Sequence, residues 1–125
     1  MSKPIIQDLF AFTQVRRNRR SYILFLLSSY LTAFTAVFAT FGAIASANAW
    51  VSVTASVLLV ALALAIFVAQ FATATQRFRD FNRSGLWALL LLIPYVGIIT
   101  VICLMVIPGT EGTNDYGADP LVKSI

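Results

Sequence analysis

The stretch RFRDFNRSGLW, residues 77–87, contains the side chains in this chain that are best suited to chemistry. Three arginines surround one carboxylate, Asp80, so the stretch carries net positive charge. Guanidinium groups bind phosphate and carboxylate through paired hydrogen bonds. Asn82 or Ser84 can cap a following helix, and Gly85 lets an anion approach that helix start closely. The pattern predicts contact with anionic lipid headgroups or with an acidic partner surface, through Arg77, Arg79, Asp80, Arg83, Ser84 and Gly85.

The rest of the chain offers little for catalysis. It contains no histidine, which is the commonest general base and metal ligand in proteins. The acidic residues near the C-terminus lack the spacing of a calcium-binding loop. Its single cysteine, Cys103, excludes an intrachain disulfide and is expected to pack as a small hydrophobe. We therefore expect no catalytic residue, no metal and no cofactor, in a protein that is not an enzyme.

The composition predicts the surroundings of these side chains. Of the 125 residues, 59% are hydrophobic and 11% are charged, whereas soluble domains contain about 25% charged residues. A soluble core of this size could not bury so much apolar surface, so a lipid bilayer is expected to solvate it. The net charge of +4 would suit nucleic acid. However, the basic residues flank apolar runs and form no nucleic-acid motif, so we expect lipid phosphate and no nucleic acid as a partner.

Three long apolar runs predict a multi-pass, all-α membrane protein that forms one domain over residues 1–125. We expect transmembrane helices at 21–47, 50–76 and 86–107, flanked by a basic segment (1–20), a charged hinge (77–85) and a tail (108–125). The 22 residues of the third run would reach about 33 Å as a helix, enough for a hydrocarbon core of about 30 Å. Residues 4–15 have the spacing of a helix lying in the membrane interface. The first run ends in ASANA, which resembles a signal-peptidase site, but the run is too long for a signal peptide.

Pro94 and Gly97 interrupt the third run. Proline removes the hydrogen bond to the carbonyl of Leu90 and presses against it, so a kink is expected. The alternative is a re-entrant hairpin that turns at IPYVG and returns the tail to the side of the membrane from which the run started. Such a turn is tolerated at that depth only where protein covers it.

The basic residues predict an orientation through the positive-inside rule. Five lie in the N-terminal segment, three in the charged hinge, none in the first loop and one, Lys123, in the tail. Three spans with both basic regions in the cytoplasm satisfy these counts. We expect a bacterial inner-membrane protein with a cytoplasmic N-terminus and a periplasmic tail.

Small residues predict how the spans pack. Close approach of helices in lipid depends on small side chains, because apolar burial does not drive association there. The second run carries such residues at a spacing of four, which makes one smooth stripe expected to meet the first span or another protomer: Ala61, Ala65, Ala69 and Thr73.

The hinge, the IPYVG segment and the tail together resemble a known family. The matching residues are Arg77, Asp80, Arg83, Ser84, Gly85 and Trp87, then Ile93, Pro94 and Gly97, then Pro108, Gly109, Gly112, Asn114, Tyr116, Gly117, Asp119 and Pro120. Upstream, Arg16, Arg19 and Tyr22 resemble the R-x-x-R-x-x-Y element that precedes the first span. The family is that of small bacterial inner-membrane proteins of the YhaH and YhaI type, which share a domain of unknown function numbered 805.

The resemblance implies a topology and residues of interest, but no activity. It marks the tail motif as a second candidate site: Asn114, Tyr116, Gly117, Asp119 and Pro120. This chain departs from the family pattern where a histidine is replaced by Arg79 and a glycine by Asn82. If that histidine carried proton chemistry, this chain could not perform it.

The leading hypothesis is a non-enzymatic accessory, scaffold or self-associating membrane protein, with a membrane-protein partner or a second copy of itself. The alternative is a small oligomeric transporter or channel. Coupled transporters usually keep an ionisable group at mid-membrane, and no predicted span contains one in its interior. A charge-free interior favours the first hypothesis.

Overall fold

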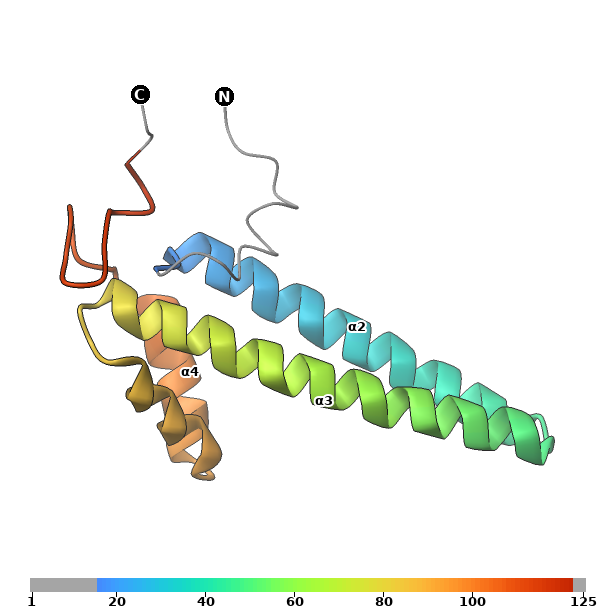
Figure 1. The fold of residues 1–125 in the computed structure, drawn as a ribbon. Coiled ribbons are helices and arrows are strands. Elements are labelled where there is room, and N and C mark those ends of the chain that lie inside the picture. Colours follow the sequence, from blue (N-terminus) through green and yellow to red (C-terminus); the bar gives the residue numbers. More distant parts are fainter. Residues whose placement is uncertain (1–15, 123–125) are drawn as a thin grey trace. The chain divides into compact units, whose positions relative to one another are not determined.

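The structure is a computed structural model that describes residues 16–122, and these form four helices (Figure 1). The helices are α2 (Arg19–Ala45), α3 (Ala49–Asp80), the 3-10 helix η1 (Gly85–Leu92) and α4 (Val96–Val106). Extended pairing in the described residues is limited to an isolated bridge between Asn114 and Gly117. The predicted all-α architecture is confirmed. The interfacial helix expected at residues 4–15 lies outside the described residues.

Two of these helices, α2 and α3, are long and apolar enough to cross a membrane. At 1.5 Å per residue, the 32 residues of α3 extend about 48 Å, whereas a hydrocarbon core is about 30 Å thick. The helix α3 is therefore longer than the apolar layer is thick, which leaves room for its last turns outside hydrocarbon. These turns contain Arg77, Arg79 and Asp80, so the charges on α3 do not have to enter hydrocarbon.

The chain divides into two compact units. The hairpin unit is Leu26–Ala69, which contains most of α2, the connection to α3 and the first part of α3. The terminal unit combines Met1–Phe25 with Gln70–Ile125, of which residues 16–25 and 70–122 are described. The terminal unit contains η1, α4 and the ends of both long helices.

In the hairpin unit, a short connection reverses the chain between α2 and α3. Asn48 caps α3, because its Oδ1 accepts hydrogen bonds from the backbone N–H groups of Trp50 (3.1 Å) and Val51 (3.3 Å). The Ser52 hydroxyl donates to the carbonyl of Ala43 at 3.2 Å and so ties the two helices together. The connection is set by local polar groups at the end of two apolar runs.

The less exposed residues of the hairpin unit follow a spacing of three and four along each helix. This is the repeat of a coiled-coil seam. On α2 they are Leu26, Ser29, Ala33, Ala36, Thr40 and Ala43, and on α3 they are Ser52, Ala55, Leu59, Leu62, Ile66 and Ala69. Small residues make up most of the α2 side, which suits close helix approach in lipid.

This seam differs from the predicted small-residue stripe. Ala61 and Ala65 are exposed, whereas Ala69 is half-buried and Thr73, in the terminal unit, is fully buried. A strict spacing of four rotates about 40° per step around a helix with 3.6 residues per turn, so the stripe drifts away from a seam with a 3.5-residue repeat. Contact of Ala61 and Ala65 with another protomer stays a prediction.

In the terminal unit, the third apolar run forms a re-entrant hairpin and not one straight helix. The helix η1 ends at Leu92, the chain turns through Pro94 and Tyr95, and α4 returns along η1 (Figure 1). Tyr95 has φ +63°, which is uncommon for a residue with a side chain. Of the expected alternatives for residues 86–107, the kinked span is therefore wrong and the re-entrant form is found.

The turn has a physical reason in two residues. Pro94 has no N–H to continue a helix. Gly97 lies so close to the first arm that a Cβ on it would stand 2.7 Å from the carbonyl oxygen of Leu91. Only glycine allows this approach without a backbone shift, so Gly97 sets the contact between η1 and α4.

Candidate functional site

The charged hinge begins where α3 ends in a Schellman motif. The N–H of Arg83 donates to the carbonyl of Phe78 and the N–H of Asn82 donates to the carbonyl of Arg79, both at 3.0 Å. Asn82 takes the left-handed conformation that this motif requires, with φ +60°. Ser84 then accepts from the N–H of Leu86 at 3.3 Å and caps η1, so of the two predicted cap residues, Asn82 and Ser84, the structure uses Ser84.

Asp80 is the centre of the site. Its side chain is buried between two arginines: Arg16 Nε donates to Oδ1 at 3.1 Å, and Arg77 Nη1 donates to Oδ2. Burial raises the pKa of the Asp80 carboxyl above its ordinary value, while Arg77 and Arg16 act in the opposite direction. Gly109 packs directly against this carboxylate, because a Cβ there would stand 2.0 Å from Oδ2. The carboxylate is thus enclosed by arginine and backbone.

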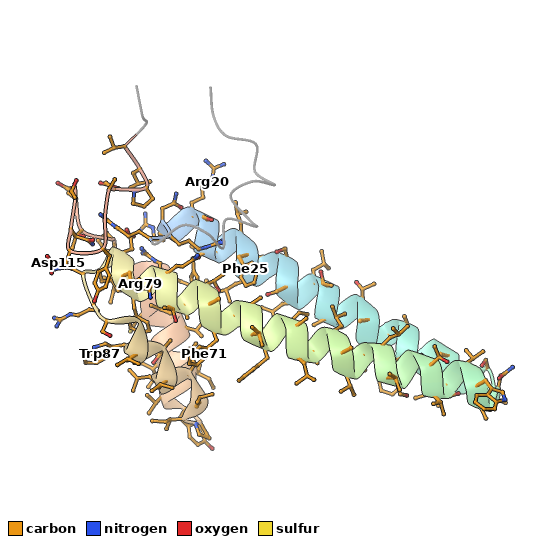
Figure 2. All side chains as sticks on the ribbon, in the orientation of Figure 1. Arg20, Phe25, Phe71, Arg79, Trp87 and Asp115 are labelled. Atoms are coloured by element: carbon orange, nitrogen blue, oxygen red, sulfur yellow. The ribbon has the colours of Figure 1, made fainter. Side chains whose placement is uncertain are left out.

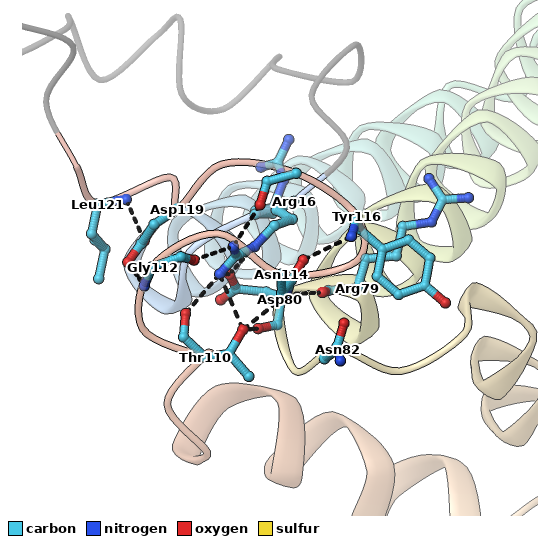
Figure 3. Close-up of polar contacts among 12 residues, drawn as sticks. Arg16, Arg79, Asp80, Asn82, Thr110, Gly112, Asn114, Tyr116, Asp119 and Leu121 are labelled. Carbon is cyan, nitrogen blue, oxygen red and sulfur yellow. Dashed lines mark hydrogen bonds and ion pairs between the residues drawn. The ribbon is translucent and has the colours of Figure 1, made fainter.

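Arg16 connects Asp80 to the tail (Figure 3). Its Nη1 donates to the carbonyls of Gly112 (2.7 Å) and Gly117 (3.0 Å), and its Nη2 donates to the carbonyl of Thr110 (2.7 Å). One buried guanidinium therefore holds three tail carbonyls and a hinge carboxylate together. These residues are 64 to 101 positions apart in the chain.

Arg77 closes the end of the re-entrant hairpin. Its Nε donates to the carbonyl of Leu104 at 2.9 Å and its Nη2 donates to the carbonyl of Ile107. The last carbonyls of a helix have no partner within that helix, and a cation there also complements the helix dipole. The guanidinium lies over the ring of Phe81, 4.4 Å from the ring centre. Burial lowers the pKa of Arg77 to about 10, so the group stays charged near neutral pH.

Arg17 joins the segment before α2 to α3. Its Nε donates to Oε1 of Gln76 at 3.0 Å, and its backbone N–H donates to the carbonyl of Gln76 at 3.3 Å. It also donates to the Ser21 hydroxyl at 3.0 Å and lies 5.6 Å from the ring centre of Phe25. Arg17 is fully buried, and it therefore packs as part of the core of the terminal unit.

The tail motif folds into a compact loop. Asn114 and Gly117 exchange two backbone hydrogen bonds at 3.0 Å, and Gly117 has φ +128°, a conformation that favours glycine. The Asn114 side chain donates to the hinge carbonyl of Arg79 at 2.9 Å and accepts from the Tyr116 N–H at 2.9 Å. Asp119 accepts from the N–H groups of Gly112 and Leu121 at 2.9 Å.

The last predicted tail residue, Pro120, directly follows Asp119 and is half-buried. The two hydrogen bonds that Asp119 accepts lower the pKa of its carboxyl, Leu121 having the larger effect.

Hinge and tail form one site, which corrects an expectation. The predicted topology with three transmembrane helices put the tail and the hinge on opposite sides of the membrane, where they could not be in contact. In the structure, Asn82 donates to Asp115 at 3.0 Å and the N–H of Asp115 donates to Asn82 Oδ1 at 3.1 Å. The re-entrant hairpin explains this, because it returns the chain to the end of α3. The structure therefore brings the tail into contact with the hinge, whereas the side of the membrane on which the tail lies stays a prediction.

The predicted anion-contacting residues divide into two groups. Arg77 and Asp80 are buried and bonded within the protein, so neither presents its charge to a ligand. Gly85 packs against Thr75, whose Cγ2 would stand 2.3 Å from a Cβ on Gly85. Arg83 is exposed and Arg79 is half-buried (Figure 2 labels Arg79). Within residues 16–122, we find no group of three or more metal-ligating side chains that could hold an ion.

Comparison with known proteins places the chain in a family. Residues 9–118 match the family described as protein of unknown function (DUF805). This chain belongs to the DUF805 family. It is 42% identical over 57 residues to inner membrane protein YhaI of Escherichia coli (strain K12), and 38% identical over 58 residues to inner membrane protein YhaH of the same strain.

Each of these matches covers 46% of this chain and 48% of the relative, so the chain matches about half the length of these DUF805 relatives. No solved structure matches it. The relatives and the apolar helices show an integral protein of the inner membrane.

The predictions from sequence missed Arg16 and Arg17 as members of the site. Both were counted only as positive charge in front of the first span. The R-x-x-R-x-x-Y element of the DUF805 resemblance, with Arg16, Arg19 and Tyr22, was the available signal. Tyr22 is buried beside these arginines in the terminal unit, and Arg19 donates to the carbonyl of Val106 at 3.4 Å.

Proposed function

We propose that this protein is a non-enzymatic, self-associating component of the inner membrane that acts as a scaffold or accessory subunit. One observation carries the proposal: the turn of the re-entrant hairpin is exposed, with Tyr95 at 80% and Ile93 at 48% exposure. The carbonyls of Ile93, Pro94 and Tyr95 accept hydrogen bonds within the hairpin, but the hydroxyl of the exposed Tyr95 needs a polar partner that hydrocarbon cannot supply, and a turn at membrane depth is tolerated only where protein covers it. Another protein surface is needed to cover it, and a second copy of the chain supplies one.

The lengths of the two arms support a deep position for this turn. The eight residues of η1 rise about 16 Å at 2.0 Å each, and the eleven residues of α4 rise about 16 Å at 1.5 Å each. Arms that start at the membrane surface therefore reach about the middle of a hydrocarbon core of about 30 Å. At that depth water cannot solvate the turn.

The state of Asp80 supports a role without catalysis. General acid and base catalysis needs a group that can exchange a proton with a substrate. Arg16 and Arg77 each occupy one oxygen of the Asp80 carboxylate, and the side chain is buried. The cluster is suited to holding the hinge, the tail and the segment before α2 in a fixed arrangement.

We further infer that the terminal unit faces the cytoplasm. All seven arginines of the described residues belong to this unit, and residues 26–69 contain no charged side chain. The positive-inside rule then places the hinge and the tail in the cytoplasm and the connection around Asn48 in the periplasm. This replaces the expected periplasmic tail.

Self-association is tested with the full chain, reconstituted from mild detergent into lipid nanodiscs. We expect the mass of a dimer or larger assembly. A spin label on Tyr95→Cys, in a Cys103→Ser background, should show low accessibility to dissolved oxygen. The matched control is a label on Val57→Cys, which is 62% exposed on α3 and is expected to face lipid. A monomeric mass, with equal oxygen accessibility at both labels, would refute the proposal.

A further inference from the structure

Arg79 differs from the buried arginines of the site because its buried Nε has no hydrogen-bond partner among the described residues. Arg16, Arg17 and Arg77 each donate to protein acceptors. The Nε of Arg79 is buried, yet it has no hydrogen-bond partner within the described part of the chain. Buried N–H donors are nearly always satisfied, so this group calls for an acceptor that residues 16–122 do not supply.

The surroundings of Arg79 indicate where this acceptor comes from. The helix η1 starts beside it, because a Cβ on Gly85 would stand 3.6 Å from Arg79 Nε. The next residues, Leu86 and Trp87, are 73% and 50% exposed, as expected of side chains that meet lipid. Arg79 therefore lies where the apolar arm of the hairpin leaves the charged hinge. At that level a bilayer presents phosphate groups.

The direction of the side chain is fixed by the protein. The Asn114 side chain holds the backbone carbonyl of Arg79, and the guanidinium lies 5.9 Å from the centre of the Tyr116 ring. Figure 3 shows the Arg79 side chain running beside Tyr116, outside the network around Asp80. Within the described residues, Asp80 forms its ion pairs with Arg16 and Arg77 and not with Arg79.

We propose that Arg79 binds a phosphate group at the membrane surface, with the guanidinium as a paired donor held by Tyr116. This rests on the membrane placement of the proposed function but not on self-association. Phosphate suits the planar guanidinium because two parallel N–H donors match two of its oxygens. The phosphate can belong to a phospholipid or to free inorganic phosphate.

The test is equilibrium binding to the full chain in detergent, with short-chain phosphatidylglycerol in one arm and inorganic phosphate in the other. Arg79→Gln should weaken binding about tenfold or more. Arg20→Gln removes the same charge from an exposed position of α2 outside the hinge and should change binding less than about threefold. Saturation by phosphatidylglycerol alone supports a lipid ligand, and saturation by inorganic phosphate supports a soluble one.

Equal weakening by the two substitutions, or no binding in either arm, overturns the proposal. If Arg79→Gln does not fold, Arg79→Lys is compared with Arg20→Lys. Lysine keeps the charge but not the paired donors, so only the first should weaken binding, and equal affinities overturn the proposal. The mass of the assembly is measured on the same samples. Loss of binding with an unchanged mass separates this site from self-association.

Discussion

Arg16 and Asp80 form a buried ion pair across 64 residues of sequence, with 3.1 Å between Arg16 Nε and Asp80 Oδ1. Arg77 takes the other carboxylate oxygen. These ion pairs hold the hinge, the tail and the segment before α2 together. The cost of breaking them is the first quantity that can be measured.

Replacing Asp80 by Asn should destabilise the protein by about 3 kcal/mol or more, because two buried guanidinium groups lose their counter-charge. Unfolding of the full chain in detergent, followed by circular dichroism, measures the change. Asp115→Asn is the matched control, since it removes an acid from the exposed part of the tail and should cost less than about 1 kcal/mol. If the two variants lost similar amounts of unfolding free energy, Asp80 would not be the residue that holds the terminal unit together.

Gly97→Ala should destabilise the re-entrant hairpin by about 1–3 kcal/mol, since the new Cβ would stand 2.7 Å from the backbone oxygen of Leu91. The control is Gly42→Ala in α2, where a Cβ meets nothing within 4 Å. Removing glycine from a helix interior gains up to about 1 kcal/mol, so this variant should be neutral or more stable. The same unfolding assay applies, and a neutral Gly97→Ala would argue against the close contact of η1 with α4.

Two substitutions of Asn82 distinguish the energetic effect of its backbone conformation from that of its side-chain contacts. Both Asn82→Gly and Asn82→Ala lose the two hydrogen bonds with Asp115. Only alanine must also be held at φ +60°, which costs about 1–2 kcal/mol. In thermal unfolding in detergent, the midpoint of the glycine variant should therefore be higher than that of the alanine variant. The reverse order would contradict the left-handed conformation of Asn82 after the end of α3.

The sidedness of the tail is testable by labelling. A cysteine placed at Thr113 and another placed at Arg83, each in a Cys103→Ser background, should react with an impermeant maleimide from the same side of the membrane. We expect both cysteines to be protected from the maleimide in spheroplasts and to be labelled in inverted vesicles. Labelling of the two positions from opposite sides would exclude the contact between Asn82 and Asp115.

The pH dependence of the tail should follow Asp119. Its pKa is lowered from the ordinary value of 3.8, mainly by hydrogen bonds from Leu121 and Gly112. A lowered pKa in the folded state means that the carboxylate adds stability above the ordinary value, and this is lost as the pH falls through the folded value.

The amide signals of Gly112 and Leu121 in NMR spectra should thus titrate together with a midpoint below 3.8, and Asp119→Ala should abolish the transition. Asp80 does not account for such a midpoint, because burial raises its pKa above 3.8. A shared midpoint above 3.8 would contradict the role of Asp119.

The amino-acid sequence by itself determined the apolar helices, their membrane surroundings and the position of the charged hinge. These depend on local composition: a charge-free run of the right length forms a helix in lipid wherever the rest of the chain goes. The cap at Ser84 and the break at Pro94 and Gly97 were likewise local, because each depends on one residue and its nearest neighbours.

Only the tertiary structure decided which arginines are buried and where the tail lies. A guanidinium at the end of a span looks the same in the sequence whether it meets solvent, lipid or a carbonyl 96 residues away, as Arg16 meets Gly112. The tertiary structure was also needed to distinguish a kinked span from a re-entrant hairpin. Pro94 permits both, and the carbonyls of Leu104 and Ile107 reach Arg77 only when the chain returns. Long-range partners fix these positions, and no local pattern specifies them.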